Sequence, residues 1–259
     1  MRDRQYIYNG LNAHEPLWAT VKIPAQQIIK EKVQLDADIH NLQDLLDLLD
    51  ENPKMENVEY STNINALHDI REPLNKLHQM IGMEKLKKDI IDQIIYYSQG
   101  LHVNNTHDYM HTVIYGPPGT GKTELAKIIG KIFSGLGILS NKSFKKVTRS
   151  DLIAGYLGQT AIKTRKLVED NLGGVIFIDE AYSMGSTEKQ DMFSKEALDT
   201  LCELLSDHKN NLMVIIAGYE KELESCFFSF NRGLESRFPW RLELREYDSL
   251  QLSQIFKKK

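Results

Sequence analysis

The chain has 259 residues, of which 41% are hydrophobic and 26% are charged, with a net charge of −4 and two cysteines. This length and composition allow one full-sized globular domain with an appendage, and they exclude a disordered or fibrous chain. The slightly acidic balance gives no global reason to expect nucleic-acid binding. Cys202 and Cys226 form no CxxC pair, no signal-peptide core follows Met1, and no apolar run reaches membrane-spanning length. We therefore expect a soluble intracellular, cytoplasmic protein in a reducing setting.

Residues 1–72 are predicted to form a mostly helical extension whose role the sequence does not define. Residues 1–32 contain short apolar runs that prolines interrupt, and we assign no function to them. From Asp36 to Asp50, Ile39 and several leucines make an apolar stripe on an acidic helix that should stop near Asn52. The simpler interpretation is a helix packed on its neighbour, and the alternative is a partner-binding helix.

From Pro73 onward, the sequence predicts a second region that extends to Lys259. Four apolar residues at helical spacing indicate a helix before a polar loop: Leu86, Ile90, Ile94 and Tyr97. His107 and His111 are four residues apart, but they lie across a loop-to-strand junction and not on one helical face. We interpret both as ordinary polar residues.

A glycine-rich loop follows the short β-branched and aromatic run 111–115. It fits the phosphate-binding pattern of a glycine, four other residues, glycine, lysine and a hydroxyl residue: Gly116, Pro117, Pro118, Gly119, Thr120, Gly121, Lys122 and Thr123. Backbone N–H groups of such a loop and the N-terminus of the next helix favour an anion. Lys122 is expected to reach the β- and γ-phosphates, and Thr123 to hold Mg²⁺. A plain Gly-Pro turn is the alternative, but the predicted strand, loop and helix in succession favour a nucleoside triphosphate site.

Two carboxylates end a wholly apolar run farther along the chain. Residues 175–178 (VIFI) are predicted to form a strand buried on both faces, and Asp179 and Glu180 follow it directly. Ligands bind at this end of the strands in parallel sheets. Asp179 is expected to hold Mg²⁺, and Glu180 to polarise the attacking water.

Three further strands are predicted at 144–148, 212–217 and 240–244, with helical patterns between them. The fold class is therefore α/β, with a doubly wound five-stranded parallel sheet. Lys142, Lys145, Lys146 and Arg149 are interpreted as one solvated strand face. Tyr156 and Leu157, framed by glycines, are expected at an exposed mobile tip.

These segments together resemble the AAA+ ATPases, and in particular the CbbX/CfxQ branch of red-type rubisco activases and the related sporulation stage V K proteins. The resemblance covers about residues 74–248 and rests on the segments YGPPGTGKTELAK, GYLGQTAIKT, GGVIFIDEAYSM, KEALDTL, VIIAGY and GLESRFP. It implies a P-loop NTPase fold, with residues 73–259 as the large AAA+ α/β subdomain. Residues 116–123 match Walker A, and Asp179 and Glu180 match Walker B.

The resemblance also implies roles that the residues alone do not indicate. Tyr156 matches the aromatic residue of the pore loop that grips polypeptide substrates, and Arg237 matches the arginine finger that acts on the neighbouring subunit's nucleotide. Ile81 and Gly82 match the segment that lines the adenine pocket. The expected cofactors are ATP and Mg²⁺, and the expected partners are further copies in a ring, such as a hexamer, and a protein substrate. Tyr219 replaces the polar residue, usually Asn, that many AAA+ proteins carry, and its role is left open.

Three functions are compatible with this pattern. The first is an ATP-driven remodeller of protein substrates. The second is a nucleotide-dependent binding or assembly module with weak hydrolysis, because the sequence after the fifth strand leaves no room for the helical lid of AAA+ proteins. The third, a DNA-directed motor or clamp loader, is disfavoured by the acidic balance and the Tyr-Leu loop. No membrane contact is expected.

Overall fold

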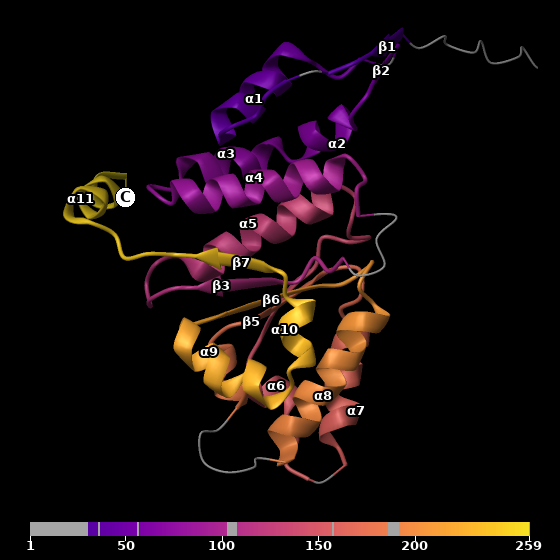
Figure 1. Cartoon of the computed structure of the whole chain (residues 1–259), viewed down its shortest axis with the longest axis vertical. Coiled ribbons are helices and arrows are strands. Elements are labelled where there is room, and N and C mark those ends of the chain that lie inside the picture. Colours follow the sequence, from indigo (N-terminus) through magenta and orange to yellow (C-terminus); the bar gives the residue numbers. More distant parts are fainter. Residues whose placement is uncertain are drawn as a thin grey trace, which may run out of the picture.

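The computed structural model describes residues 31–35, 37–55, 57–102, 108–156, 158–185 and 192–258. Their centre is a five-stranded sheet with the order β4-β5-β6-β3-β7, in which every neighbouring pair is parallel (Figure 1). The strands are β3 (Thr112–Tyr115), β4 (Phe144–Val147), β5 (Val175–Ile178), β6 (Met213–Gly218) and β7 (Trp240–Glu243). All five predicted strands are confirmed, with ends that differ by a residue or so, and so is the doubly wound α/β fold.

Helices cover both faces of this sheet (Figure 1). On one side lie α3 (Arg71–Gln79), α4 (Glu84–Ser98) and α5 (Lys122–Gly135), and on the other lie α6 (Arg149–Leu152), α7 (Thr160–Glu169), α8 (Met192–Asp207), α9 (Glu220–Cys226) and α10 (Gly233–Arg237). Successive strand residues point to opposite faces, so each strand feeds two cores. In β5, Val175 and Phe177 join the core with α3 to α5, whereas Ile176 and Ile178 join the other core.

The N-terminal part adds an outer layer on the α3–α4 side. Helix α1 (Leu42–Glu51) begins at Leu42, later than the predicted Asp36, because Asn41 and Asp44 form a capping box there. It ends at Glu51, with Asn52 as its C-cap, close to the predicted stop near Asn52, and its leucines belong to the same core as α3 and α4, which confirms the packed-helix interpretation. Helix α2 (Ile64–Asp69) and a two-stranded parallel sheet of β1 (Glu31–Val33) and β2 (Val58–Tyr60) complete this layer. The expectations for residues 1–30 lie outside the described residues.

Three short elements complete the fold: the 3-10 helices η2 (Ala181–Met184) and η3 (Phe228–Phe230), and helix α11 (Ser249–Lys258) beyond β7. Figure 1 shows α11 standing to one side of the sheet and its covering helices. Within the described ranges, no helix has the length and apolar character needed to cross a bilayer.

Strand register determines where the functional segments meet. Tyr115 at the end of β3 is paired with Gly218 at the end of β6, and Ile178 at the end of β5 is paired with Ile216. Because the strands are parallel, the loops that follow β3, β5 and β6 leave the same edge of the sheet. This edge therefore brings together the glycine-rich loop, the two carboxylates and Tyr219.

Candidate functional site

The glycine-rich loop joins β3 to the N-terminus of α5, as the sequence predicted. All three of its glycines have positive φ: Gly116 (156°), Gly119 (76°) and Gly121 (94°). At Gly116 a Cβ atom would lie 2.6 Å from the carbonyl oxygen of Leu244, so this position also needs a residue without a side chain. The hydroxyl of Thr120 donates to the Pro117 carbonyl oxygen at 2.8 Å and stabilises the bend from within.

Lys122, the first residue of α5, extends back over this loop. Its Nζ donates to the carbonyl oxygens of Gly116 (2.8 Å) and Pro117 (2.7 Å) and lies 5.9 Å from the centre of the Tyr219 ring. Burial lowers the pKa of Lys122, while the charges of Asp179 and Glu180 act in the opposite direction. The ammonium group therefore lies against the loop, where it also feels the charges of the two carboxylates.

Asp179 and Glu180 lie directly after β5, at the edge that the register predicts. The Thr123 hydroxyl donates to Oδ2 of Asp179 at 3.5 Å, which brings the two predicted metal ligands together. Glu180 is exposed and has a positive φ of 52°, an uncommon conformation for a residue with a side chain. The chain can therefore turn sharply into η2, and Glu180 is presented at the end of the strand.

The oxygen donors at this point fit Mg²⁺, which is usually held by one or two carboxylates together with phosphates and water. Thr123 and Asp179 supply a hydroxyl and a carboxylate oxygen. In the part of the chain that the structure describes, no group of three or more His, Cys, Asp and Glu side chains could hold a metal ion. Two oxygen ligands from the protein would leave the other positions around the ion to phosphate oxygens and water.

Two adjoining hollows form around the loop. The first, of about 470 Å³, is lined by Lys122, Thr123, Asp179, Glu180 and Tyr219, among others. The second, of about 360 Å³, shares Gly119 and Gly121 with the first and is otherwise lined by Gln79, Met80, Ile81, Tyr247, Leu252, Ile255 and Lys258. Of the predicted residues, the first hollow is lined by Pro118, Gly119, Gly121, Lys122, Thr123, Asp179 and Glu180, and the second by Ile81. Gly116, Pro117, Thr120 and Gly82 line neither of these two hollows.

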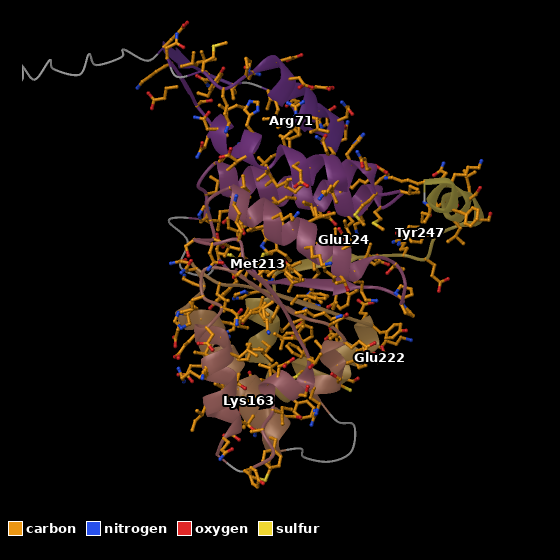
Figure 2. All side chains as sticks on the ribbon, turned by 180° about the vertical axis from the view of Figure 1, so that it is seen from behind. Arg71, Glu124, Lys163, Met213, Glu222 and Tyr247 are labelled. Carbon is orange, nitrogen blue, oxygen red and sulfur yellow. The ribbon has the colours of Figure 1, made fainter. Side chains whose placement is uncertain are left out.

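Tyr247 is a residue of the second hollow that the sequence analysis did not identify. Its hydroxyl donates to the carbonyl oxygen of Thr120 at 3.1 Å, and burial raises its pKa. Figure 2 shows it where the chain passes from the sheet to α11. Gly82 lies in the turn before α4 at φ 71°, where a Cβ atom would meet the Gln251 side chain of α11 at 2.7 Å. The α3–α4 turn and α11 therefore lie close together beside the loop.

Arg237 lies elsewhere, at the end of α10, and does not line either hollow. Its Nε donates to Oγ of Ser206 at 2.7 Å, its Nη1 donates to the Gly233 carbonyl oxygen at 2.7 Å, and its guanidinium lies 5.9 Å from the centre of the Tyr109 ring. A finger that acts on a neighbouring subunit would be placed away from its own loop in this way. Its role stays a prediction.

Tyr156 is 74% exposed, as predicted for a loop tip, whereas Leu157 lies outside the described residues. Hydrogen bonds hold the segment before this tip, residues 150–153, which we call the stem. Nζ of Lys163 donates to the carbonyl oxygens of Ser150 (2.6 Å) and Ile153 (3.0 Å). Tyr156 is thus an exposed aromatic side chain on a braced base.

Lys142, Lys145 and Lys146 of the basic cluster are exposed, as predicted for a solvated face, whereas Arg149 is half-buried, so the interpretation was wrong for Arg149. Lys146 and Arg149 also make specific contacts. Lys146 pairs with Asp179, with Nζ 2.7 Å from Oδ2. Nη1 of Arg149 donates to the carbonyl oxygens of Ser183 and Met184 and to Oγ of Ser194, at 2.8, 2.9 and 2.8 Å. Periodicity alone could not reveal these contacts, because the partners come from the turn after β5, from η2 and from α8.

The interpretation of His111 as an ordinary polar residue was also wrong. Its side chain is wholly buried, one residue before β3. Nδ1 accepts the backbone N–H of Val214 at 3.1 Å, and Nε2 lies 3.3 Å from the Leu205 carbonyl oxygen. Burial lowers the pKa of His111 to about 4. His107 lies outside the described residues.

The parallel sheet and its glycine-rich loop together define a P-loop nucleotide-binding protein of the α/β class. A family profile described as "ATPase family associated with various cellular activities (AAA)" matches residues 112–244, just over half of the chain. The chain belongs to this family, and the resemblance inferred from its motifs is confirmed.

Two curated relatives support the same assignment. A cfxQ-like protein of Acanthamoeba polyphaga mimivirus is 39% identical over 196 residues, which cover 76% of this chain and 48% of the relative. Stage V sporulation protein K of Bacillus subtilis is 38% identical over 201 residues, which cover 74% and 61% of the two chains. The chain therefore spans about half to three fifths of the length of these relatives. Among solved structures, the AAA domain of FIGL-1 in complex with ADP has a TM-score of 0.51 at 24% identity and covers 70% of this chain and 59% of that one, which shows a shared fold.

Proposed function

We propose that this protein binds ATP with Mg²⁺ and hydrolyses ATP to ADP and phosphate. One observation carries the proposal: Lys122, Thr123, Asp179 and Glu180, from two segments far apart in sequence, line one hollow beside the glycine-rich loop. A phosphate loop without the acidic pair would support binding alone. The pair supplies the metal ligand and the water-activating carboxylate that hydrolysis needs.

Each residue has a role that its position supports. The N–H groups of the loop and the start of α5 bind the phosphates, and Lys122 exchanges the carbonyl oxygens of Gly116 and Pro117 for β- and γ-phosphate oxygens. Glu180 accepts the proton of a water aimed at the γ-phosphorus. Thr123 and Asp179 would hold Mg²⁺, which neutralises charge on the phosphates when bound.

Steady-state ATPase measurements on Glu180→Gln test this proposal. The turnover number should fall by about 10²-fold or more, because the amide cannot act as a base, while ATP affinity stays near that of the wild type. The control is Glu169→Gln, on the exposed face of α7, which should keep wild-type activity. Unchanged turnover in Glu180→Gln would refute the assignment. ATP binding without any Glu180-dependent turnover would favour a nucleotide-dependent binding module instead.

We further propose that the protein works as a ring of identical subunits, such as a hexamer, that remodels a protein substrate. Arg237 lies apart from its own chain's nucleotide hollow, as needed to serve a neighbour, and Tyr156 presents an exposed aromatic side chain on a braced stem. Light scattering with and without ATP measures the assembly. If the particle mass stays that of one chain at every protein and ATP concentration, the ring proposal is wrong.

A further inference from the structure

The side chain of Lys146 places a positive charge at the metal-binding carboxylate of the candidate site. Lys146 lies on β4, the neighbour of β5, and is paired in register with Phe177, two residues before Asp179. Its Nζ lies 2.7 Å from Oδ2 of Asp179, the same oxygen that accepts the Thr123 hydroxyl at 3.5 Å. One carboxylate oxygen therefore faces both the ammonium group and the hydroxyl that is expected to hold metal.

The two cations cannot share this oxygen without cost. Mg²⁺ binds oxygen ligands at about 2.0–2.1 Å and carries two positive charges, so an ammonium group in hydrogen-bond contact with the same oxygen would be strongly repelled. The Lys146 side chain is 51% exposed and can move into solvent, whereas that of Asp179 is 22% exposed and fixed at the end of β5. The lysine is therefore the group that must leave.

The neighbouring residue shows that this contact is particular to Lys146. Lys145 is also exposed on β4, but it forms no ion pair with any residue that the structure describes. The two lysines carry the same charge one position apart on one strand, but their side chains point to opposite faces: the charge of Lys145 acts on Asp151, whereas Lys146 is paired with Asp179. The chain thus contains its own matched control.

We propose that Lys146 competes with the divalent cation for Asp179 and so sets the metal concentration at which the nucleotide site is filled. The inference rests on the proposed function, because it concerns the same metal and nucleotide. With metal scarce, the ammonium group neutralises Asp179. With metal abundant, Lys146 is displaced toward solvent, and Asp179 and Thr123 take the ion together with the phosphates. Metal binding therefore costs the free energy of the partly exposed Lys146–Asp179 ion pair, together with the remaining repulsion between Lys146 and the metal ion.

The test measures binding of a fluorescent ADP analogue while Mg²⁺ is titrated from excess EDTA upward. Lys146→Gln should lower the Mg²⁺ concentration at the midpoint by about threefold to tenfold, the range for losing a partly exposed ion pair and a nearby like charge. Affinity for the analogue at saturating Mg²⁺ should stay within about twofold of the wild type, since Lys146 is then displaced and does not contact phosphate. Lys145→Gln should keep the wild-type midpoint, and Lys146→Arg, which keeps the charge, should have a midpoint at or above it.

Each other outcome overturns the inference in its own way. Equal midpoints in the wild type and Lys146→Gln would show that the lysine does not oppose metal binding. Weaker binding of Lys146→Gln at saturating Mg²⁺ would show that Lys146 contacts phosphate instead. Equal shifts in both glutamine variants would reduce the effect to a general loss of positive charge. If the wild type binds no adenine nucleotide with or without metal, the proposed function fails and this inference fails with it.

Discussion

Replacing His111 by glutamine should remove a pH dependence of stability that the buried imidazole creates. In the neutral form with its hydrogen on Nε2, His111 accepts the Val214 N–H and donates to the Leu205 carbonyl oxygen. A proton added at Nδ1 would face the Val214 N–H, which is itself a donor. Burial is the main reason that the pKa of His111 falls to about 4; the Leu205 carbonyl opposes the change, and the charge of Arg237 adds to it.

The direction and the magnitude of this pH dependence follow from the pKa of His111 in the unfolded and in the folded protein. An unfolded histidine takes up a proton near the ordinary pKa of 6.5, whereas the folded protein resists protonation until about pH 4. Stability is therefore complete above pH 6.5 and is lost as the pH falls through this window. Each pH unit between the two values costs about 1.4 kcal/mol, so the whole window amounts to about 3 kcal/mol.

The assay is urea unfolding of the wild type and His111→Gln at several pH values from 7.5 to 5.0. Glutamine keeps one donor and one acceptor at this position, so the variant should fold. The difference in unfolding free energy between the two proteins should change by about 2 kcal/mol over this range. His78→Gln, on the exposed face of α3, is the control, and its unfolding free energy should change with pH in the same way as that of the wild type. A parallel curve for His111→Gln would refute the reasoning.

Three further predictions concern the residues around the site. Arg237→Ala should keep nucleotide affinity within about threefold but lower ATP hydrolysis by about 10³-fold or more, and activity that is retained at every protein concentration would contradict a finger role. Arg149→Met removes the donor to Ser183, Met184 and Ser194, so the unfolding free energy in urea should fall by about 1–3 kcal/mol; a change below about 0.5 kcal/mol would show these bonds to be unimportant. Tyr247→Phe loses the bond to the loop and should weaken fluorescent nucleotide binding about threefold to tenfold, and equal affinity would count against it.

Local patterns predicted the parts of the site that follow each other along the chain. The strand, glycine-rich loop and helix from 111 to 135 were recognisable because each has its own periodicity or backbone requirement. Residues 175–178 were recognisable as a buried strand because all four are apolar, and the two carboxylates after them were assigned to the sheet edge for that reason. The structure has the two strands and the helix at the predicted positions, and the two carboxylates follow β5.

Contacts between distant segments could not be predicted in the same way. The position of Lys146 beside Asp179 depends on β4 pairing with β5. The local pattern of one strand does not show which strand lies next to it. The burial of His111 depends on α8 and β6, which follow about a hundred residues later. The strands β1 and β2 were missed because three residues each are too few to show alternation.

The bonds of Arg149 have a mechanical consequence. The Arg149 guanidinium, at the first turn of α6, donates hydrogen bonds to η2 and to the first turn of α8. Helix η2 comes directly after Glu180. Lys163 also donates to the carbonyl oxygens of Ser150 in α6 and of Ile153, which follows α6, so hydrogen bonds connect the segment after Glu180 to the chain that leads to Tyr156. Under the proposed function, a movement of that turn during ATP hydrolysis would be transmitted through these hydrogen bonds toward Tyr156. ATP hydrolysis and contact with a protein substrate would then be coupled within one subunit.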